Sequence, residues 1–221
     1  MIHNKISRDY KNLIKIYASQ VGDYYASQTN NKGLRNWWFR KRQHIIGNLV
    51  KKYYRGEKVL DIGCGNSVWN KNGIPTIGID ICEAMLKYDK HNIPNFIPLK
   101  ADISRGLPIK SESVTMVVIT EVLEHINSYI YLIEEIRRIL KRGGVAIVSV
   151  PYNKLPGIWN IIFSLWCKYK WWKDKDEYYF NLCGHMINFN VDKIQRSFNR
   201  FTFVELRTIK LLTIFCAVRK E

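Results

Sequence analysis

The sequence has few of the features that would assign it to a zinc-binding, disulfide-rich or membrane-spanning class. Its five cysteines include no C-x-x-C pair, which argues against a structural zinc site and against a disulfide framework. No apolar run reaches the roughly 18 residues that a membrane span needs. The first five residues also lack the apolar core of a signal peptide. We therefore expect a cytoplasmic protein with reduced thiols.

Acidic residues are also scarce, because 19 of them stand against 35 basic residues and leave a formal net charge of +16. A field of this sign attracts nucleic acid, anionic lipid or another polyanion, and a general lysine bias would explain it equally well. Hydrophobic residues at 47% and charged residues at 24% are ordinary for a globular protein. With 221 residues, no internal repeat and no low-complexity linker, the chain suits one domain with a single core.

Short apolar segments alternate with amphipathic ones through most of the chain, which predicts an α/β fold. Residues 114–120 are apolar at nearly every position, which indicates burial on both faces and hence a parallel sheet. We expect a Rossmann-like doubly wound sheet of about seven strands, mostly parallel with a C-terminal antiparallel hairpin, plus N-terminal helices. The predicted strands are 58–62, 75–79, 95–99, 114–120, 144–150, 202–209 and 211–218; the predicted helices lie within 8–55, 82–89, 128–141 and 191–200.

A glycine turn follows the first predicted strand. Asp61 ends the strand, and Gly63 and Gly65 allow the backbone to turn tightly and approach a ligand, because no Cβ stands in the way. Asp80 ends the next strand, where a carboxylate can accept hydrogen bonds from both hydroxyls of a ribose. Asp102 follows the third strand, where a carboxylate can accept a proton from an adenine amino group. The pattern predicts a nucleotide-like cofactor at the carboxyl edge of the sheet.

With the segment Glu121-Val122-Leu123-Glu124-His125 after the fourth strand, these motifs resemble the class I S-adenosylmethionine-dependent methyltransferases. The closest likeness is to the E-x-x-E-H branch, similar to methyltransferase family 11 and the ubiquinone-biosynthesis O-methyltransferases. It covers residues 57 to 150 and implies S-adenosyl-L-methionine as the cofactor. In this family the glycines border the methionine moiety, Asp80 the ribose, and Asp102 with Ile103 the adenine. The cofactor-binding residues that the resemblance implies are Asp61, Gly63, Cys64, Gly65, Asp80, Ile81, Asp102 and Ile103.

Two departures from the family pattern stand beside this likeness. The third glycine of the loop is replaced by Asn66-Ser67, and Thr115 stands where the fourth strand commonly begins with an aspartate. The missing glycine disfavours a dehydrogenase, whose loop needs it for close helix packing. Simpler structural explanations also remain open, since Asp80 can cap a helix and Asp102 can be a turn residue.

The catalytic candidates lie after the fourth strand. Methyl transfer needs an aligned acceptor and, where the nucleophile carries a proton, a base. We expect His125 and Glu121 to be catalytic, with His125 as the base; a histidine that merely caps the following turn is the alternative. A divalent metal ion that lowers the pKa of an acceptor hydroxyl is a further alternative, with Glu121, Glu124, His125 and His185 as ligands. The small-RNA 3′-terminal 2′-O-methyltransferases and the ubiquinone-biosynthesis enzymes resemble this arrangement, and metal-free relatives share the motif.

Three further segments bear on the methyl acceptor. The segment 36–42 contains a W-W-F-R-x-R pattern that resembles a helix closing over the cofactor, or else a packing helix. The apolar segment 158–166, followed by lysines, predicts a lid or pocket wall first, and a contact with an anionic membrane interface or a dimer contact second. Basic residues near 137–142 can hold RNA phosphates, although cations at a helix end are also expected from its dipole.

We expect a single methyltransferase domain that O-methylates a small, lipid-like or glycan acceptor. An RNA 2′-O-methyltransferase with a metal at the Glu/Glu/His/His cluster is the alternative. A non-catalytic cofactor-binding module that associates with nucleic acid or membrane is the alternative from another class, and a location peripheral to a membrane goes with it. The expected segments are a helical N-terminal cap (1–56), a cofactor-binding core (57–150), a substrate-side insertion (151–190) and a last helix with hairpin (191–221).

Overall fold

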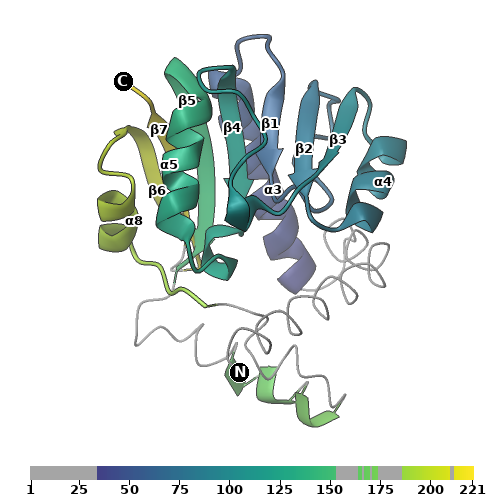
Figure 1. Ribbon diagram of the computed structural model, residues 1–221. Helices are drawn as coiled ribbons and strands as arrows, with labels where there is room; N and C mark the ends of the chain where they lie inside the picture. Colours follow the sequence, from purple (N-terminus) through teal and green to yellow (C-terminus); the bar gives the residue numbers. More distant parts are fainter. Residues whose placement is uncertain (1–33, 153–163, 166, 170, 174–185, 210–211) are drawn as a thin grey trace, which may run out of the picture.

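The computed structural model describes residues 34–152, 164–165, 167–169, 171–173, 186–209 and 212–221. Its centre is a seven-stranded sheet in the order β3-β2-β1-β4-β5-β7-β6 (Figure 1). The first five of these strands are mutually parallel, and β7 runs antiparallel to both of its neighbours. The strands are β1 (Val59–Ile62), β2 (Thr76–Asp80), β3 (Phe96–Lys100), β4 (Val114–Thr120), β5 (Leu140–Pro151), β6 (Thr202–Ile209) and β7 (Thr213–Arg219).

The order of the strands fixes where a ligand can enter. The first strand, β1, lies in the interior of the sheet. From there the chain moves outward through β2 to β3 and then returns to β4 on the other side of β1. The connections after β1 and β4 therefore leave the sheet in opposite directions at the carboxyl edge, which is the lower edge in Figure 1. Ligands of open α/β sheets bind at such a switch point.

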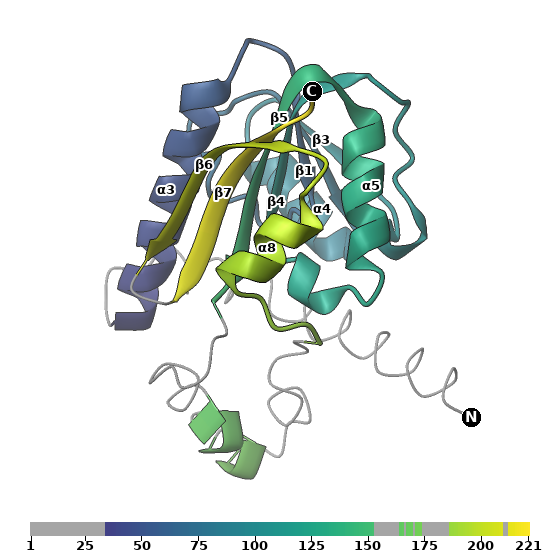
Figure 2. The same ribbon diagram turned by 90° about the vertical axis from the view of Figure 1, so that its left-hand side faces the viewer.

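Helices cover both faces of the sheet (Figure 2). Alternate residues of the central strands point to opposite faces, so Val117 and Val148 join one buried cluster while Val118 and Ile147 join the other. The first cluster packs against α5 and α8, the second packs against α3, and α4 contacts β2 and β3. The helices are α3 (Leu34–Tyr53), α4 (Glu83–Asn92), α5 (Tyr129–Ile139) and α8 (Val191–Ser197), with short 3-10 turns η1 (Ile103–Arg105) and η2 (Leu123–His125).

The predicted fold is confirmed, including the C-terminal antiparallel pair of β6 and β7. The predicted end of the helix at residue 141 was wrong. Leu140 already has extended backbone and pairs with Val114, so α5 ends at Ile139 and β5 begins at the next residue. Gly143, with φ of +73°, therefore lies inside the long strand and not at a helix end. The expected division into four segments stays a prediction, and residues 8–33 of the predicted N-terminal helices lie outside the described residues.

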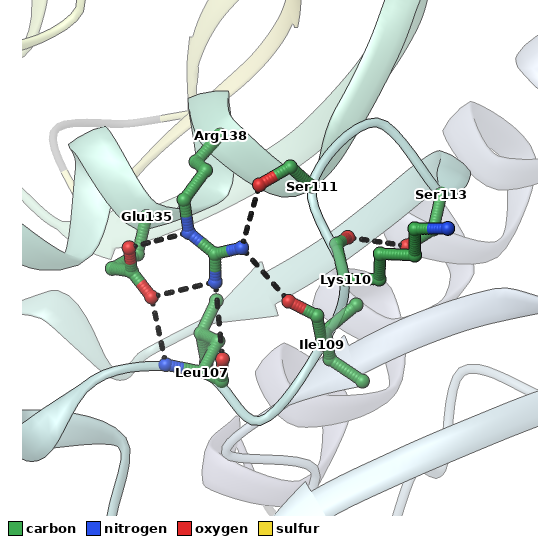
Figure 3. Close-up of polar contacts among 7 residues, drawn as sticks. All are labelled: Leu107, Ile109, Lys110, Ser111, Ser113, Glu135 and Arg138. Atoms are coloured by element: carbon green, nitrogen blue, oxygen red, sulfur yellow. Dashed lines mark hydrogen bonds and ion pairs between the residues drawn. The ribbon is translucent and has the colours of Figure 1, made fainter.

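One ion pair fastens the loop before β4 to α5 (Figure 3). The guanidinium of Arg138 donates to both carboxylate oxygens of Glu135, to the carbonyl oxygens of Leu107 and Ile109, and to the hydroxyl of Ser111. The carboxylate of Glu135 also accepts a hydrogen bond of 2.9 Å from the N–H of Leu107. Arg138 belongs to the basic group that the sequence offered to RNA phosphates, and its donors serve the fold instead.

Candidate cofactor and active site

The loop after β1 begins with two left-handed glycines, Gly63 with φ of +63° and Gly65 with φ of +51°. A Cβ on Gly63 would lie 2.6 Å from Cγ2 of Val122, so a side chain is excluded by backbone conformation and by space. The N–H of Gly63 donates to the carbonyl of Ile79 over 2.7 Å, which holds the turn against the end of β2. The loop therefore lies at the carboxyl edge of the sheet, next to the segment that follows β4.

The Asp61 side chain holds this loop in place through two hydrogen bonds. It is 1% exposed, and its Oδ2 accepts hydrogen bonds of 2.7 Å from the hydroxyl of Ser67 and from the indole N–H of Trp69. Burial raises the pKa of Asp61 to about 7, against the effect of these two donors. Asp61 thus stabilises the shape of the loop, and its contact with a cofactor stays a prediction.

Asp80 connects the loop to α4. Its carboxylate accepts hydrogen bonds from the N–H of Gly65 over 3.0 Å and from the N–H of Cys82 over 2.8 Å. Burial raises the pKa of Asp80, while these N–H groups favour the charged form. Ile81, which follows it, is half-buried. The helix-capping alternative is thus realised in part, because Cys82 is the N-cap residue of α4. Cys64, in the loop itself, packs against Leu86 and Phe96.

Asp102 caps the 3-10 turn η1. Its Oδ1 accepts from the backbone N–H of Ser104 over 3.1 Å and from the Ser104 hydroxyl over 2.6 Å, and its Oδ2 lies 3.2 Å from Nε of Arg105. The next residue, Ile103, belongs to the buried core. The alternative of a turn residue is realised here, and contact of these two residues with adenine stays a prediction.

Asn66 is a further candidate for binding the cofactor. In the sequence it stands out only as a replacement for the third glycine of the loop. Its side chain is 3% exposed, and neither the amide oxygen nor the amide nitrogen has a hydrogen-bond partner among the described residues. Buried polar groups are nearly always hydrogen-bonded, so this amide has both a donor and an acceptor to offer a ligand. The loop therefore fits a polar, nucleotide-like cofactor, and a polar residue at a position usual for glycine was the available signal.

Glu121 brings three elements together after β4. Its Oε2 lies 3.0 Å from Nη1 of Arg42 on α3, and its Oε1 accepts a hydrogen bond of 2.8 Å from the hydroxyl of Ser149 on β5. Its φ of +56° is unusual for a residue other than glycine. The guanidinium of Arg42 also lies over the ring of Phe39, 5.0 Å from its centroid. Arg42, the last arginine of the W-W-F-R-x-R pattern, therefore binds Glu121.

Glu124 is fully buried, and neither of its carboxyl oxygens has a hydrogen-bond partner among the described residues. Burial, and then the charge of Glu121, raise its pKa well above the usual range. Its Oε1 lies 3.7 Å from Nε2 of His125, which is partly exposed at the end of η2. The backbone carbonyl of Glu124 accepts from the N–H groups of Met186 and Ile187, so the chain returns to this point after the region 153–185.

Three of the four predicted metal ligands, Glu121, Glu124 and His125, lie among the described residues. Within the described ranges, no group of three or more histidine, cysteine, aspartate or glutamate side chains could hold an ion, and this includes Glu121, Glu124 and His125. The fourth predicted ligand, His185, lies outside these ranges. A metal ion stays a prediction that depends on His185.

Comparison with known proteins agrees with the fold and the loop. Residues 60–148 match the family model described as a methyltransferase domain. A probable S-adenosylmethionine-dependent methyltransferase of Mycolicibacterium smegmatis is 31% identical over 125 residues, which are 52% of this chain and 46% of the relative. A demethylmenaquinone methyltransferase of Staphylococcus epidermidis is 26% identical over 138 residues, 58% of this chain and 56% of the relative. The chain spans about half the length of the curated relatives that it matches.

Solved structures show the same fold. A complex between the Haloferax volcanii Trm112 methyltransferase activator and a methyltransferase matches with a TM-score of 0.65 at 16% identity, over 92% of this chain and 96% of the other. A methyltransferase of Thermotoga maritima matches with a TM-score of 0.64 at 15% identity, over 95% and 100%. These likenesses, at 15–16% identity, show the shared fold alone. The sequence matches over residues 60–148 support a methyltransferase domain in this part of the chain, with S-adenosylmethionine as its cofactor.

Proposed function

We propose that this protein transfers the methyl group of S-adenosylmethionine to an oxygen nucleophile on a small, lipid-like or glycan acceptor. The observation that carries the proposal is the glycine loop at the switch point of the sheet, together with His125 in the turn η2 that follows β4. The cofactor supplies a methyl group on a sulfonium, which is reactive enough to transfer without a covalent enzyme intermediate. The protein has to align the acceptor and to receive its proton.

The residues of the loop bind the cofactor in this proposal. Gly63 and Gly65 let the backbone approach the methionine moiety, and Asn66 offers its unpaired buried amide there. Asp80 accepts hydrogen bonds from the ribose with the lone pairs that Gly65 and Cys82 leave free. Asp102 and Ile103 border the adenine, as the family resemblance implies.

His125 is the proposed general base. As the acceptor oxygen forms its bond to the methyl carbon, the carbon–sulfur bond breaks and the imidazole takes the hydroxyl proton. Nε2 of His125 lies 3.7 Å from the carboxyl of Glu124, which can orient the ring. Glu121 takes part by position, because its carboxylate is shared between Arg42 and Ser149 and fixes the turn that carries His125.

The proposed acceptor class is supported by the names of sequence relatives. The relatives of 26–27% identity named demethylmenaquinone methyltransferases are in line with a lipid-like acceptor. Among the described residues, no helix has both the length and the apolar character that a membrane span requires. The RNA alternative has less support, because two of the basic residues near 137–142 already have partners in the protein. Arg138 binds Glu135, and Nζ of Lys141 lies 3.0 Å from the carboxylate of Glu57.

Two measurements on the full chain test the proposal. Isothermal titration with S-adenosylhomocysteine should show at least tenfold weaker binding for Asp80→Ala and unchanged binding for the exposed control Asp192→Ala. Transfer of tritiated methyl into extracts, fractionated into RNA, lipid, protein and small molecules, should label the lipid or small-molecule fraction. His125→Ala should keep the affinity for S-adenosylhomocysteine and lose roughly a hundredfold or more in transfer.

The contrary results are distinct. Binding unaffected by Asp80→Ala would remove the proposed cofactor site. Binding without transfer to any fraction would favour the non-catalytic module, and label in RNA would favour the nucleic-acid alternative. Metal analysis of protein purified without chelator, with Glu124→Ala as the comparison, decides the metal alternative, which fails if no metal is bound or activating.

A further inference from the structure

The described residues between β5 and α8 include a helical stretch whose outward side carries large apolar side chains. Residues 164–165, 167–169 and 171–173 are helical. Leu165, Tyr169 and Trp172 are 61%, 53% and 66% exposed. Their spacing of four and three residues places them one above another on the same side of a helix. Most of the predicted apolar segment 158–166, including Trp166, lies outside the described residues.

Charge borders this apolar stripe on both flanks. At about 100° per residue, Leu165 and Trp172 occupy the centre of the outward side, while Lys168 and Lys173 lie to either side of it. Both lysines are exposed. Cys167 falls on the opposite side of the same helix and is fully buried, which fixes the stripe as the side turned away from the protein.

The stripe is similar in size to the largest apolar patch of a typical monomer. Large side chains each bring about 150–250 Å² of surface, so the exposed fractions leave roughly 300 Å² of adjacent surface in water. The largest apolar patch of a monomer is often functional. A leucine with two aromatic residues at the centre and lysines at the edges is the composition of a helix that lies in the plane of a membrane interface.

We propose that the described helical residues 164–165, 167–169 and 171–173 dock on the surface of a bilayer that contains anionic lipid. The apolar stripe enters the interface while the lysines, supported by the net charge of +16, meet the headgroups. A nucleic acid is a poorer fit, since it would need the cations along the centre of the contact. A second copy of the chain is also poorer, because a two-fold contact would bring the like-charged flanks together.

Docking would turn the active edge of the sheet toward the lipid. In both views the helical stretch lies beyond the edge at which the parallel strands end, the edge that carries the cofactor loop (Figures 1 and 2). The inference goes beyond the proposed methyl transfer and does not depend on it, because docking is measured without cofactor or acceptor.

Vesicle flotation with the full chain tests the proposal. Vesicles of phosphatidylcholine alone are compared with vesicles containing three parts in ten of phosphatidylglycerol. We expect the wild type to float with the anionic vesicles, and the triple variant L165S/Y169S/W172S to lose at least tenfold in partitioning. K168Q/K173Q should lose about fivefold per lysine at low salt. The matched control is I130S/Y131S on α5, which changes two apolar residues of 48% exposure each and should float like the wild type.

Several outcomes would overturn the proposal. These are a wild type that floats with neither vesicle, a triple variant that floats like the wild type, or a control that loses as much as the triple variant. A wild type that ignores vesicles but dimerises, or binds RNA, through the stripe would replace the bilayer with that partner. Circular dichroism of each variant ensures that a lost signal comes from the surface and not from unfolding, and titration with S-adenosylhomocysteine reports separately on the cofactor site.

Discussion

Asp89 on α4 is fully buried, and neither of its carboxyl oxygens has a hydrogen-bond partner among the described residues. The hydroxyl of Ser67 lies near it but gives its single proton to Asp61. Burial, and then the charge of Asp61, raise the pKa of Asp89 to about 9. The folded protein therefore keeps a proton on Asp89 that the unfolded chain loses above about pH 4. Stability should fall as the pH rises, since the unfolded state binds fewer protons.

The substitution Asp89→Asn removes this penalty with little change of shape. Between pH 3.8, the ordinary pKa of the group, and pH 8, only the unfolded chain loses this proton. At about 1.4 kcal/mol per pH unit, the folded state would lose roughly 5–6 kcal/mol of stability over this range. Local relaxation and water penetration lower the cost of a buried charge in real proteins, so we expect a gain of about 2–3 kcal/mol at pH 8 relative to pH 5. Any constant cost of burying the amide is the same at every pH, which makes the slope the informative quantity.

Urea unfolding between about pH 5 and pH 8.5 measures the effect. The difference in the free energy of unfolding between Asp89→Asn and the wild type should grow with pH. The exposed exchange Asp192→Asn in the first turn of α8 should show a difference that does not grow. A gap between Asp89→Asn and the wild type that stays constant, or narrows with rising pH, would refute the reasoning.

Further substitutions separate the cofactor loop from the rest of the fold. Gly63→Ala should weaken S-adenosylhomocysteine binding at least tenfold by titration; Gly56→Ala, also at positive φ but in open space, should leave the affinity unchanged. Arg138→Met should lower the free energy of unfolding in urea by about 2 kcal/mol without changing that affinity, because its network lies in the loop before β4. Arg42→Met should cost about 2–3 kcal/mol by leaving the Glu121 carboxylate without its cation, and Arg42→Lys should restore part of it; equal loss in both variants would contradict this.

The fold could be predicted because its strands are local patterns. The nearly continuous apolar run of β4 and the alternation around it were sufficient for a parallel sheet. The start of β5 could not be found in this way. The predicted helix extended to residue 141, but Leu140 belongs to the sheet because it pairs with Val114, a residue distant in the sequence.

The site could be predicted only as far as strand ends reveal it. Acidic residues at the ends of β1 and β2 were visible in the sequence, but their partners were not. The Arg42–Glu121 ion pair joins residues 79 positions apart, and no local pattern indicates it. Asp89 was not noticed in the sequence, and Asn66 was noticed only as a replacement for glycine, because both look like ordinary surface residues until tertiary packing buries them.

The outer strand β3 has a consequence for the protein in concentrated solution. It is an edge of the sheet, and its exposed positions include Pro98 and Lys100. Proline offers no N–H to an incoming strand, and lysine brings a charge that disfavours burial, so edge strands that carry them resist pairing with another chain. Replacing both with β-branched residues would turn this edge into a template for aggregation while leaving the cofactor loop on β1 untouched.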